Sequence, residues 1–410
     1  MHKVVVEKPY AFVPPYPGIG WPAFMQRFAR ARLRRKFGLV SVTCRGLEHL
    51  ERSRRAGHGI LLAPNHCRPA DPFVVFELAR QAGVVPYTMA SAHLFAHSKV
   101  QAWLLERSGV FSVYREGVDR QAVGAAIDIL TEAKRPLVIF PEGVITRANE
   151  RLSALMDGTA FIARSAAKRR AAASPPGAVV VHPVALRYTF RGDVADALEP
   201  ALRALEARLG WAPQHGLALP ERVVKVGAGL LGLKEVEQLG AVQSGTIEER
   251  VERLIDHLLV PLEREWAGGK REPTVVGRVK RLRAAVLPAM VAGEVSDAER
   301  ERRWAQLEAM YLAQQLWCYP PGYVRSRPTR ERLLETVERF EEDLNDECRI
   351  YRPMSVTVRV GEAIHVPPQR DRTAAEDPVM AAIEAQLEAM IAAMSEPGPA
   401  PGAEARPTGM

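Results

Sequence analysis

GILLAPNHCRPADPFVVFELARQ, residues 59–81, passes from an apolar run through a turn to a helical pattern. The run GILLAP predicts a buried strand. The segment DPFVVFELARQ predicts a helix, because Asp71 followed by Pro72 suits a helix start. Similar strand and helix patterns alternate from residue 41 to about residue 190. This alternation predicts an α/β fold with a central, mostly parallel sheet flanked by helices.

Further β-branched and apolar runs predict the rest of the sheet. Strands are expected in SVTCRG, VPYTMA, GVFSVY, RPLVIFP and GAVVVHPVALRY. Helices are expected at residues 72–82, 98–107, 118–134 and 153–170. Pro183 interrupts the last of these strands, and because proline lacks a backbone N–H, it predicts an edge position or a bulge there.

The pattern changes after Arg191, where long charged amphipathic helices begin. A single strand-like run, SVTVRVGEAIHVPP, follows them at residues 355–368 and needs a sheet to join. We therefore predict five regions: a basic amphipathic N-terminal arm at 1–40, an α/β core at 41–195, a helical insertion at 196–352, a returning strand and C-terminal helix at 353–394, and a disordered tail at 395–410.

Composition and cysteine spacing favour a cytoplasmic protein. The chain has 410 residues, of which 47% are hydrophobic, yet no apolar run reaches the roughly 18 residues of a membrane-spanning helix. We expect no secretory signal in the first residues. The four cysteines form no CxxC pair, which suits a reducing compartment and argues against a structural zinc site.

Basic charge is concentrated near the N-terminus. Residues 1–60 contain twelve Lys or Arg and three Glu, whereas the whole chain carries a net charge of +8. In WPAFMQRFARARLRRKFGL, residues 21–39, apolar side chains recur at helical spacings among arginines. A basic amphipathic helix suits an anionic membrane surface, but its apolar face could equally pack on the core. Nucleic acid is not expected as a partner, because no binding motif accompanies the charge.

His66 and Asp71 follow the strand predicted from GILLAP. One explanation is structural: a turn histidine and an aspartate that caps the next helix. The other is catalytic, because α/β sheets bind ligands at the carboxyl ends of their strands, and a carboxylate beside an imidazole fixes its tautomer. These residues alone leave both explanations open.

Two further blocks are expected at the same edge of the sheet. FPEG, residues 140–143, ends the apolar run LVIF, and Arg115 follows the run GVFSV. Taken singly, Glu142 and Gly143 could belong to a plain turn, and Arg115 could be a solvated residue at a helix start.

The four blocks together, namely His-x4-Asp, GVFSVYR, FPEG and the strand VHPVAL, resemble the glycerolphosphate and lysophosphatidic acid acyltransferase family. The resemblance covers residues 41–190 and the strand at 361–366. It implies two catalytic residues, with a general base oriented by a carboxylate: His66 and Asp71. It implies three acceptor-binding residues: Arg115, Glu142 and Gly143. A guanidinium is apt for a phosphate, and a glycine lets the backbone approach a ligand.

The activity that this resemblance implies is O-acyl transfer. A fatty acyl group would move from acyl-CoA or acyl-carrier protein to a lysophospholipid hydroxyl, with 1-acyl-glycerol-3-phosphate as the expected acceptor in phospholipid biosynthesis. It implies neither a cofactor nor a metal. The implied partners are the acyl donor, the lipid acceptor and the inner face of an anionic membrane, to which the protein would bind peripherally. The alternatives are a non-phosphate lipid acceptor and a non-catalytic lipid-binding scaffold.

Some positions depart from the family pattern, and these departures bear on which acceptor is bound. Cys67, Arg68, Pro69 and Ala70 replace a small or polar run, and Tyr114 stands where a charged residue is common. Arg147 is displaced from its usual place close after FPEG.

Three other patterns are expected to be structural. The segment GAGLLG, residues 227–232, matches the dinucleotide fingerprint GxGxxG, but no strand follows it. Cys67 is not expected to act as a nucleophile. His93 and His97 lack a third metal ligand nearby in the sequence.

Overall fold

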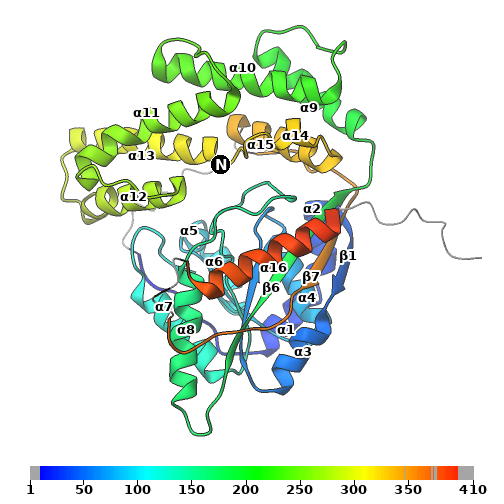
Figure 1. Ribbon diagram of the computed structural model, residues 1–410, viewed down its shortest axis with the longest axis vertical. Coiled ribbons are helices and arrows are strands. Elements are labelled where there is room, and N and C mark those ends of the chain that lie inside the picture. The colour runs from blue at the N-terminus through cyan, green and yellow to red at the C-terminus, as the bar shows by residue number, and fades with distance from the viewer. Residues whose placement is uncertain (1–9, 346, 371–372, 374–375, 396–410) are drawn as a thin grey trace, which may run out of the picture.

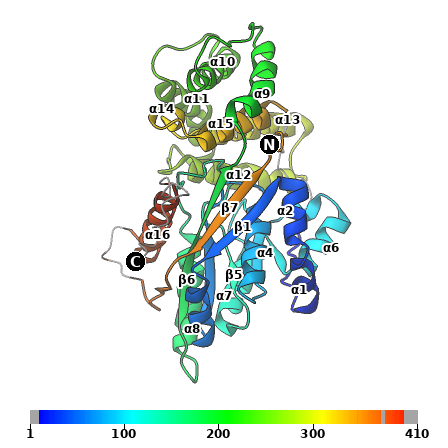
Figure 2. The ribbon, with the colours of Figure 1, turned by 90° about the vertical axis from the view of Figure 1, so that its right-hand side faces the viewer.

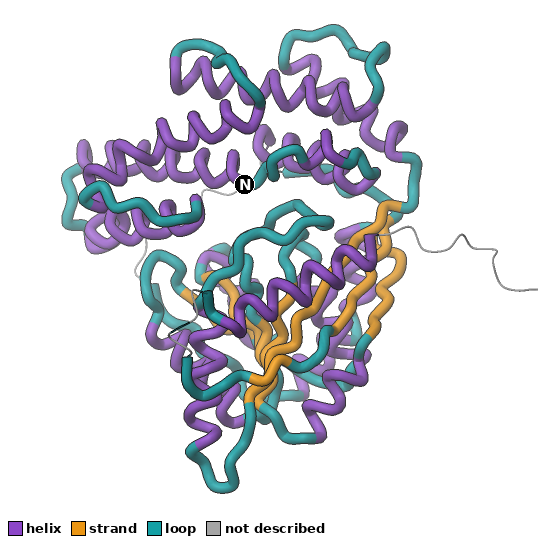
Figure 3. Tube along the Cα trace, viewed as in Figure 1, coloured by secondary structure: helices purple, strands orange, loops and turns teal. Residues whose placement is uncertain are grey.

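The described residues of the computed structural model are 10–345, 347–370, 373 and 376–395. They form one eight-stranded sheet with helices on both faces and a layer of further helices at one end (Figures 1 and 3). The strands are β1 (Leu39–Arg45), β2 (Gly59–Pro64), β3 (Tyr87–Ser91), β4 (Val110–Val113), β5 (Leu137–Val138), β6 (Val179–Phe190), β7 (Met354–Val360) and β8 (Ile364–His365).

The sheet is mostly parallel, which confirms the predicted fold class. Its strand order is β1-β7-β6-β2-β5-β3-β4, with β8 also paired to β6. Strands β6, β2, β5, β3 and β4 run in one direction. Strands β7 and β1 run parallel to each other but antiparallel to β6, and Figure 2 shows these three side by side.

The run SVTVRVGEAIHVPP does return to this sheet. It forms two strands, β7 and β8, both of which pair with β6. The proposed boundaries of the domains remain predictions, and residues 396–410 of the predicted disordered tail lie outside the described residues.

Pro183 lies inside the sheet, so the expected edge position is wrong. Strand β6 pairs with β2 on one side and with β8 and β7 on the other. On that second side, β8 pairs with β6 up to Val181 and β7 pairs with it from Val184. Pro183 falls between these two ladders, where its missing N–H disrupts no antiparallel pairing.

Helices cover both faces of the sheet because strand side chains alternate between two apolar clusters. Val180 and Val184 of β6 belong to one cluster, and Val179 and Val181 belong to the other. The helices of the core are α1 (Gly20–Gln26), α2 (Ala29–Phe37), α3 (Leu47–Arg55), α4 (Asp71–Gln81), α5 (His93–Ala96), α6 (Lys99–Arg107), α7 (Arg120–Glu132), α8 (Gly158–Ala171) and α16 (Pro378–Ser395). Helices α2, α3 and α4 pack on one face, and α7, α8 and α16 on the other.

The expected single helix over residues 21–39 is two shorter helices, α1 and α2. The backbone N–H groups of Arg27 and Phe28 donate to carbonyls three residues earlier, which ends the first helix in a tight turn. Leu33 of α2 is buried in the core, and Phe37 packs on Phe73 with ring centroids 5.5 Å apart. The core-packing explanation therefore holds for α2.

The remaining helices form a block that begins after the carboxyl end of β6. They are α9 (Val194–Arg208), α10 (Leu219–Leu239), α11 (Ile247–Ala267), α12 (Val275–Ala292), α13 (Asp297–Trp317), α14 (Tyr323–Ser326) and α15 (Arg330–Asn345). Helices α11, α12 and α13 share an apolar core of their own. Helices α9, α10 and α15 contribute instead to the core of the sheet. None of the helices in the described part of the chain is long and apolar enough to cross a membrane.

Candidate functional site

Three parallel strands bring the predicted site residues to one edge of the sheet. His66 follows β2, Glu142 follows β5 and Arg115 follows β4, so all three lie beyond carboxyl ends. Gly143 has a φ of 69°, and a Cβ built there would lie 2.8 Å from the Met156 methyl and 3.7 Å from an Arg115 nitrogen. The FPEG turn and Arg115 are therefore close neighbours.

His66 and Asp71 form the pair that their spacing predicts. Nδ1 of His66 lies 2.9 Å from Oδ2 of Asp71, and the Asp71 carboxylate is fully buried. The imidazole also packs against Phe140 in a tilted arrangement, with ring centroids 4.3 Å apart. A carboxylate at Nδ1 favours the tautomer with its proton on that nitrogen, which leaves Nε2 free to accept a proton. Only 16% of the histidine side chain is exposed.

Two further groups hold Asp71 in place. The Tyr188 hydroxyl donates to Oδ1, and the Arg68 backbone N–H donates to Oδ2 at 2.8 Å. Burial and the nearby Asp71 charge raise the pKa of Tyr188 well above its usual value, so the hydroxyl keeps its proton and acts as donor. Asp71 therefore orients His66 from a fixed position. Tyr188 was not among the predicted site residues, because its place in an apolar strand indicated only core packing.

The Glu142 side chain contacts the backbone of His66. One of its oxygens accepts the N–H of His66 and the other accepts the N–H of Ser153 at 3.0 Å. The side chain is buried, with 2% of the residue exposed. From the opposite side, the Thr146 N–H donates to the His66 carbonyl at 2.9 Å. In this structure, the two oxygens of Glu142 therefore tie the loop after β2 to the loop after β5; its predicted role in binding the acceptor remains a prediction.

Two asparagine side chains extend the hydrogen bonding of β6 beyond the end of β2. The Asn65 amide accepts from the Leu186 N–H at 2.7 Å and donates to its carbonyl at 3.1 Å. The Asn149 amide does the same with Tyr188, at 2.7 Å in both directions. Each amide thus occupies the place of a neighbouring strand and fastens one active-site loop to β6. Nothing in the sequence spacing indicated this.

Arg115 lines a small pocket between α12 and the sheet. The pocket is also lined by Ser91, His93, Tyr114 and Arg283. Within the described part of the chain, Arg115 makes neither a hydrogen bond nor a salt bridge. Burial lowers its pKa below the usual value, in spite of the nearby acidic residue that forms a 2.6 Å salt bridge with Arg283. A guanidinium in this state favours an anionic ligand.

Cys67 is not poised as a nucleophile. Its side chain is fully buried, and burial together with the Asp71 charge raises the pKa of the thiol well above its usual value. A neutral thiol is a poor nucleophile. For His93, the structure shows a hydrogen bond to Ser91 at 2.8 Å. No group of three or more His, Cys, Asp or Glu that could hold a metal ion occurs among the described residues.

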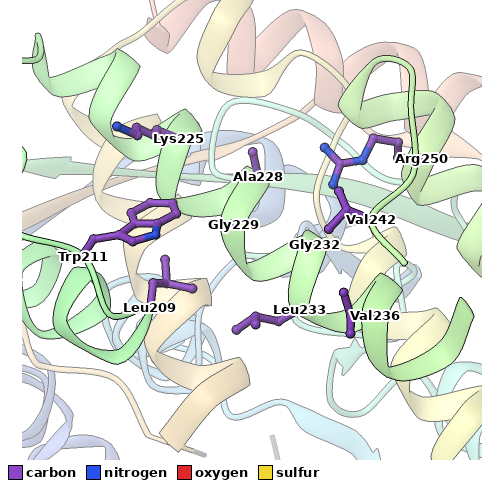
Figure 4. A pocket seen from close by; sticks show the side chains of 10 residues that line it. All are labelled: Leu209, Trp211, Lys225, Ala228, Gly229, Gly232, Leu233, Val236, Val242 and Arg250. Atoms are coloured by element: carbon purple, nitrogen blue, oxygen red, sulfur yellow. The ribbon is translucent and has the colours of Figure 1, made fainter. Parts of the chain in front are cut away.

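The segment GAGLLG lies within helix α10 and not in a strand–turn–helix unit. A Cβ on Gly229 would lie 2.6 Å from Trp211, and one on Gly227 would lie 2.9 Å from Phe340. These glycines therefore let aromatic rings approach the helix. Figure 4 shows Gly229 beside Trp211 and Gly232 beside Val242. Both glycines line an apolar groove of about 400 Å³. The groove lies on the helical block and includes none of the predicted site residues, so we do not assign the reaction to it.

Comparison with known families finds a match, which covers the strands that carry these residues. Residues 41–187 match the family model described as Acyltransferase. This segment is an acyltransferase domain. The match confirms the resemblance to glycerolphosphate and lysophosphatidic acid acyltransferases, and it supports an acyltransferase enzyme. It ends before the helical block. No curated protein matches the chain.

The buried Glu142 should make the stability of the acyltransferase depend on pH. Burial raises its pKa from 4.5 to about 7, so the folded chain binds this proton more tightly than the unfolded chain. The contribution of Glu142 to the free energy of unfolding should therefore grow as pH falls from about 7 to about 4.5, by up to about 3 kcal/mol.

Chemical denaturation of wild type and Glu142→Gln at about pH 5 and about pH 8 measures this contribution. We expect the free energy of unfolding of wild type, minus that of Glu142→Gln, to be larger at the lower pH. A difference that is equal at both pH values would contradict the raised pKa.

Proposed function

We propose that this acyltransferase moves a fatty acyl group from an acyl thioester, acyl-CoA or acyl-carrier protein, to the hydroxyl of a lysophospholipid. The expected acceptor is 1-acyl-glycerol-3-phosphate, in phospholipid biosynthesis. The observation that carries the proposal is the pair of His66 and buried Asp71 at the carboxyl edge of the sheet. General base catalysis requires an imidazole nitrogen that can accept a proton, and the contact of Nδ1 with Asp71 leaves Nε2 for this role.

In the proposed reaction, Nε2 of His66 removes the proton from the acceptor hydroxyl. The hydroxyl oxygen attacks the thioester carbonyl carbon and forms the new C–O bond. The C–S bond then breaks, and the leaving thiolate takes the proton back from the imidazolium. Asp71 stabilises the imidazolium between these steps, and Tyr188 keeps the carboxylate in place. No covalent acyl-enzyme is required.

The proposal of a phosphate on the acceptor rests on Arg115. A half-buried guanidinium that forms no hydrogen bond or salt bridge among the described residues can accept an anion, and a phosphate would provide both charge and hydrogen-bond acceptors. Arg283 of α12 lines the same pocket, so an anionic group there would meet two guanidiniums. Gly143 lets Met156 approach the FPEG turn, because a side chain there would clash with Met156 and would contact Arg115.

The proposed membrane contact is an exposed apolar surface, made of Trp21, Phe24, Phe28, Val100 and Trp103. These residues are between 37% and 69% exposed, and the rings of Trp21 and Trp103 lie 5.4 Å apart. The basic side chains of α2 adjoin it in the sequence. Exposed aromatic rings with neighbouring cations suit the interface of an anionic membrane. We propose a cytoplasmic enzyme bound peripherally to the inner membrane face.

Replacement of the proposed base tests the function. His66→Ala should lower kcat by roughly 10²-fold or more, because general base catalysis contributes about that much. Thiol release from acyl-CoA or acyl-carrier protein, measured with 1-acyl-glycerol-3-phosphate, follows the reaction. The control His97→Ala changes an exposed histidine and should keep wild-type activity. Unchanged turnover in His66→Ala would refute the mechanism.

The same assay with a panel of acceptors separates the two acceptor classes. Lysophospholipids with a terminal phosphate should give the highest kcat/KM. Higher kcat/KM for an acceptor that lacks phosphate would instead favour the alternative, a non-phosphate lipid acceptor.

Vesicle flotation tests the membrane contact. Phe24→Ser with Phe28→Ser should reduce binding to anionic vesicles, because both rings are exposed. Arg34→Gln with Arg35→Gln should reduce binding at low salt and have less effect at high salt. The matched control, Arg203→Gln with Lys270→Gln, removes two exposed cations from the helical block. Undiminished binding by both test variants would contradict the proposal that this surface contacts the membrane.

A further inference from the structure

Helix α15 carries a row of acidic side chains, of which Glu335 and Glu338 contact the loops after β2 and β5. Four of its glutamates are buried, with at most 8% of each residue exposed: Glu331, Glu335, Glu338 and Glu341. Buried carboxylates at these spacings require cationic or polar partners. Two of the partners are Arg68 and Arg147, at positions where the sequence departs from the family pattern.

Glu338 contacts both of these arginines. Its Oε1 lies 2.8 Å from Nη1 of Arg68, and its Oε2 lies 3.5 Å from Nη1 of Arg147. Arg68 also lies 3.6 Å from Glu335, and Arg147 also pairs with Glu342. All of these groups come from distant parts of the chain, so the bridge joins the helical block to two separate loops of the core.

Each arginine is adjacent to an atom that holds the catalytic pair. The backbone N–H of Arg68 is the donor to Asp71. Arg147 follows Thr146, whose N–H donates to the His66 carbonyl. A shift of either arginine would therefore move a hydrogen bond of the pair.

The glutamates of this cluster stabilise the positive charges of Arg68 and Arg147. Burial opposes the charge on Arg68, but the carboxylates of Glu338 and Glu335 outweigh it and raise the pKa of the guanidinium. The pKa of Arg147 is also raised, because the charges of Glu338 and Glu342 outweigh the effect of burial. Loss of the Glu338 charge would leave two buried guanidiniums short of an anion, so the loops that carry them would relax.

We propose that Glu338 is a positioning residue, which holds the loops of His66 and Asp71 in their reactive arrangement through Arg68 and Arg147. The helical block is then part of the catalytic apparatus. This inference rests on the proposed function for its kinetic consequence, but the holding of the loops is independent of the substrate.

The test compares Glu338→Gln with Glu235→Gln. Glu235 is also fully buried and binds Arg250 at 2.9 and 2.7 Å, but it joins α10 to α11, away from the active-site loops. Glu235→Gln removes a buried carboxylate that pairs with one arginine, and Glu338→Gln removes one that pairs with two. Only Glu338→Gln should lower kcat, by roughly 10²-fold with KM nearly unchanged, since a misplacement of about 1 Å has that effect.

Glu338→Asp keeps the negative charge and guards against a failure to fold. Its shorter side chain cannot reach both arginines, so its kcat should fall between wild type and Glu338→Gln. Wild-type kcat in Glu338→Gln, or an equal loss in Glu338→Gln and Glu235→Gln, would overturn the proposal.

Hydrogen exchange gives a result that does not depend on activity. Residues 65–71 and 144–150 should exchange faster in Glu338→Gln and Glu338→Asp than in wild type, but not in Glu235→Gln. If wild type transfers no acyl group, the proposed function fails, and exchange still decides whether Glu338 holds the loops. Unchanged exchange in both Glu338 variants would refute that role.

Discussion

The buried carboxylate of Asp71 is the group on which the site depends. It meets the imidazole of His66, the hydroxyl of Tyr188 and the N–H of Arg68. A buried charge is tolerated only where hydrogen bonds surround it, so these donors must be in place before the pair can work. Two of these donors lie in the loop between β2 and α4, and the third, Tyr188, lies on strand β6. The rest of the fold serves to bring them together.

Strand β6 explains how this assembly is reached. It continues six residues beyond its last partner in β2, and β7 supports that extension. Tyr188 lies on the extension, and the amides of Asn65 and Asn149 take the place of a strand on its other side. The site therefore depends on β7, which lies more than 160 residues later in the chain. The helical block separates β6 from β7 and returns α15 to the same edge.

The local pattern of the sequence predicted much of the fold around the site. The strand and helix around His66, the parallel sheet and the return of residues 355–368 follow from periodicity and from the need of a strand for partners. The contacts of Tyr188 and Glu338 could not be predicted from the sequence. Tyr188 lies in an apolar strand, which normally indicates core packing, and Glu338 lies on a charged helix face, which normally indicates exposure to solvent. The unbroken helix at residues 21–39 was wrong because local hydrogen bonding at Arg27 and Phe28 overrides the apolar spacing.

The most direct test of the account is the turnover of Asp71→Asn. Asparagine keeps the size of the side chain but removes the charge that, in the proposed mechanism, orients and stabilises the imidazolium. The account predicts that acyl transfer from the thioester to 1-acyl-glycerol-3-phosphate falls by roughly 10²- to 10⁴-fold in kcat, with the circular dichroism spectrum of the folded protein retained. A folded variant with wild-type kcat would contradict it.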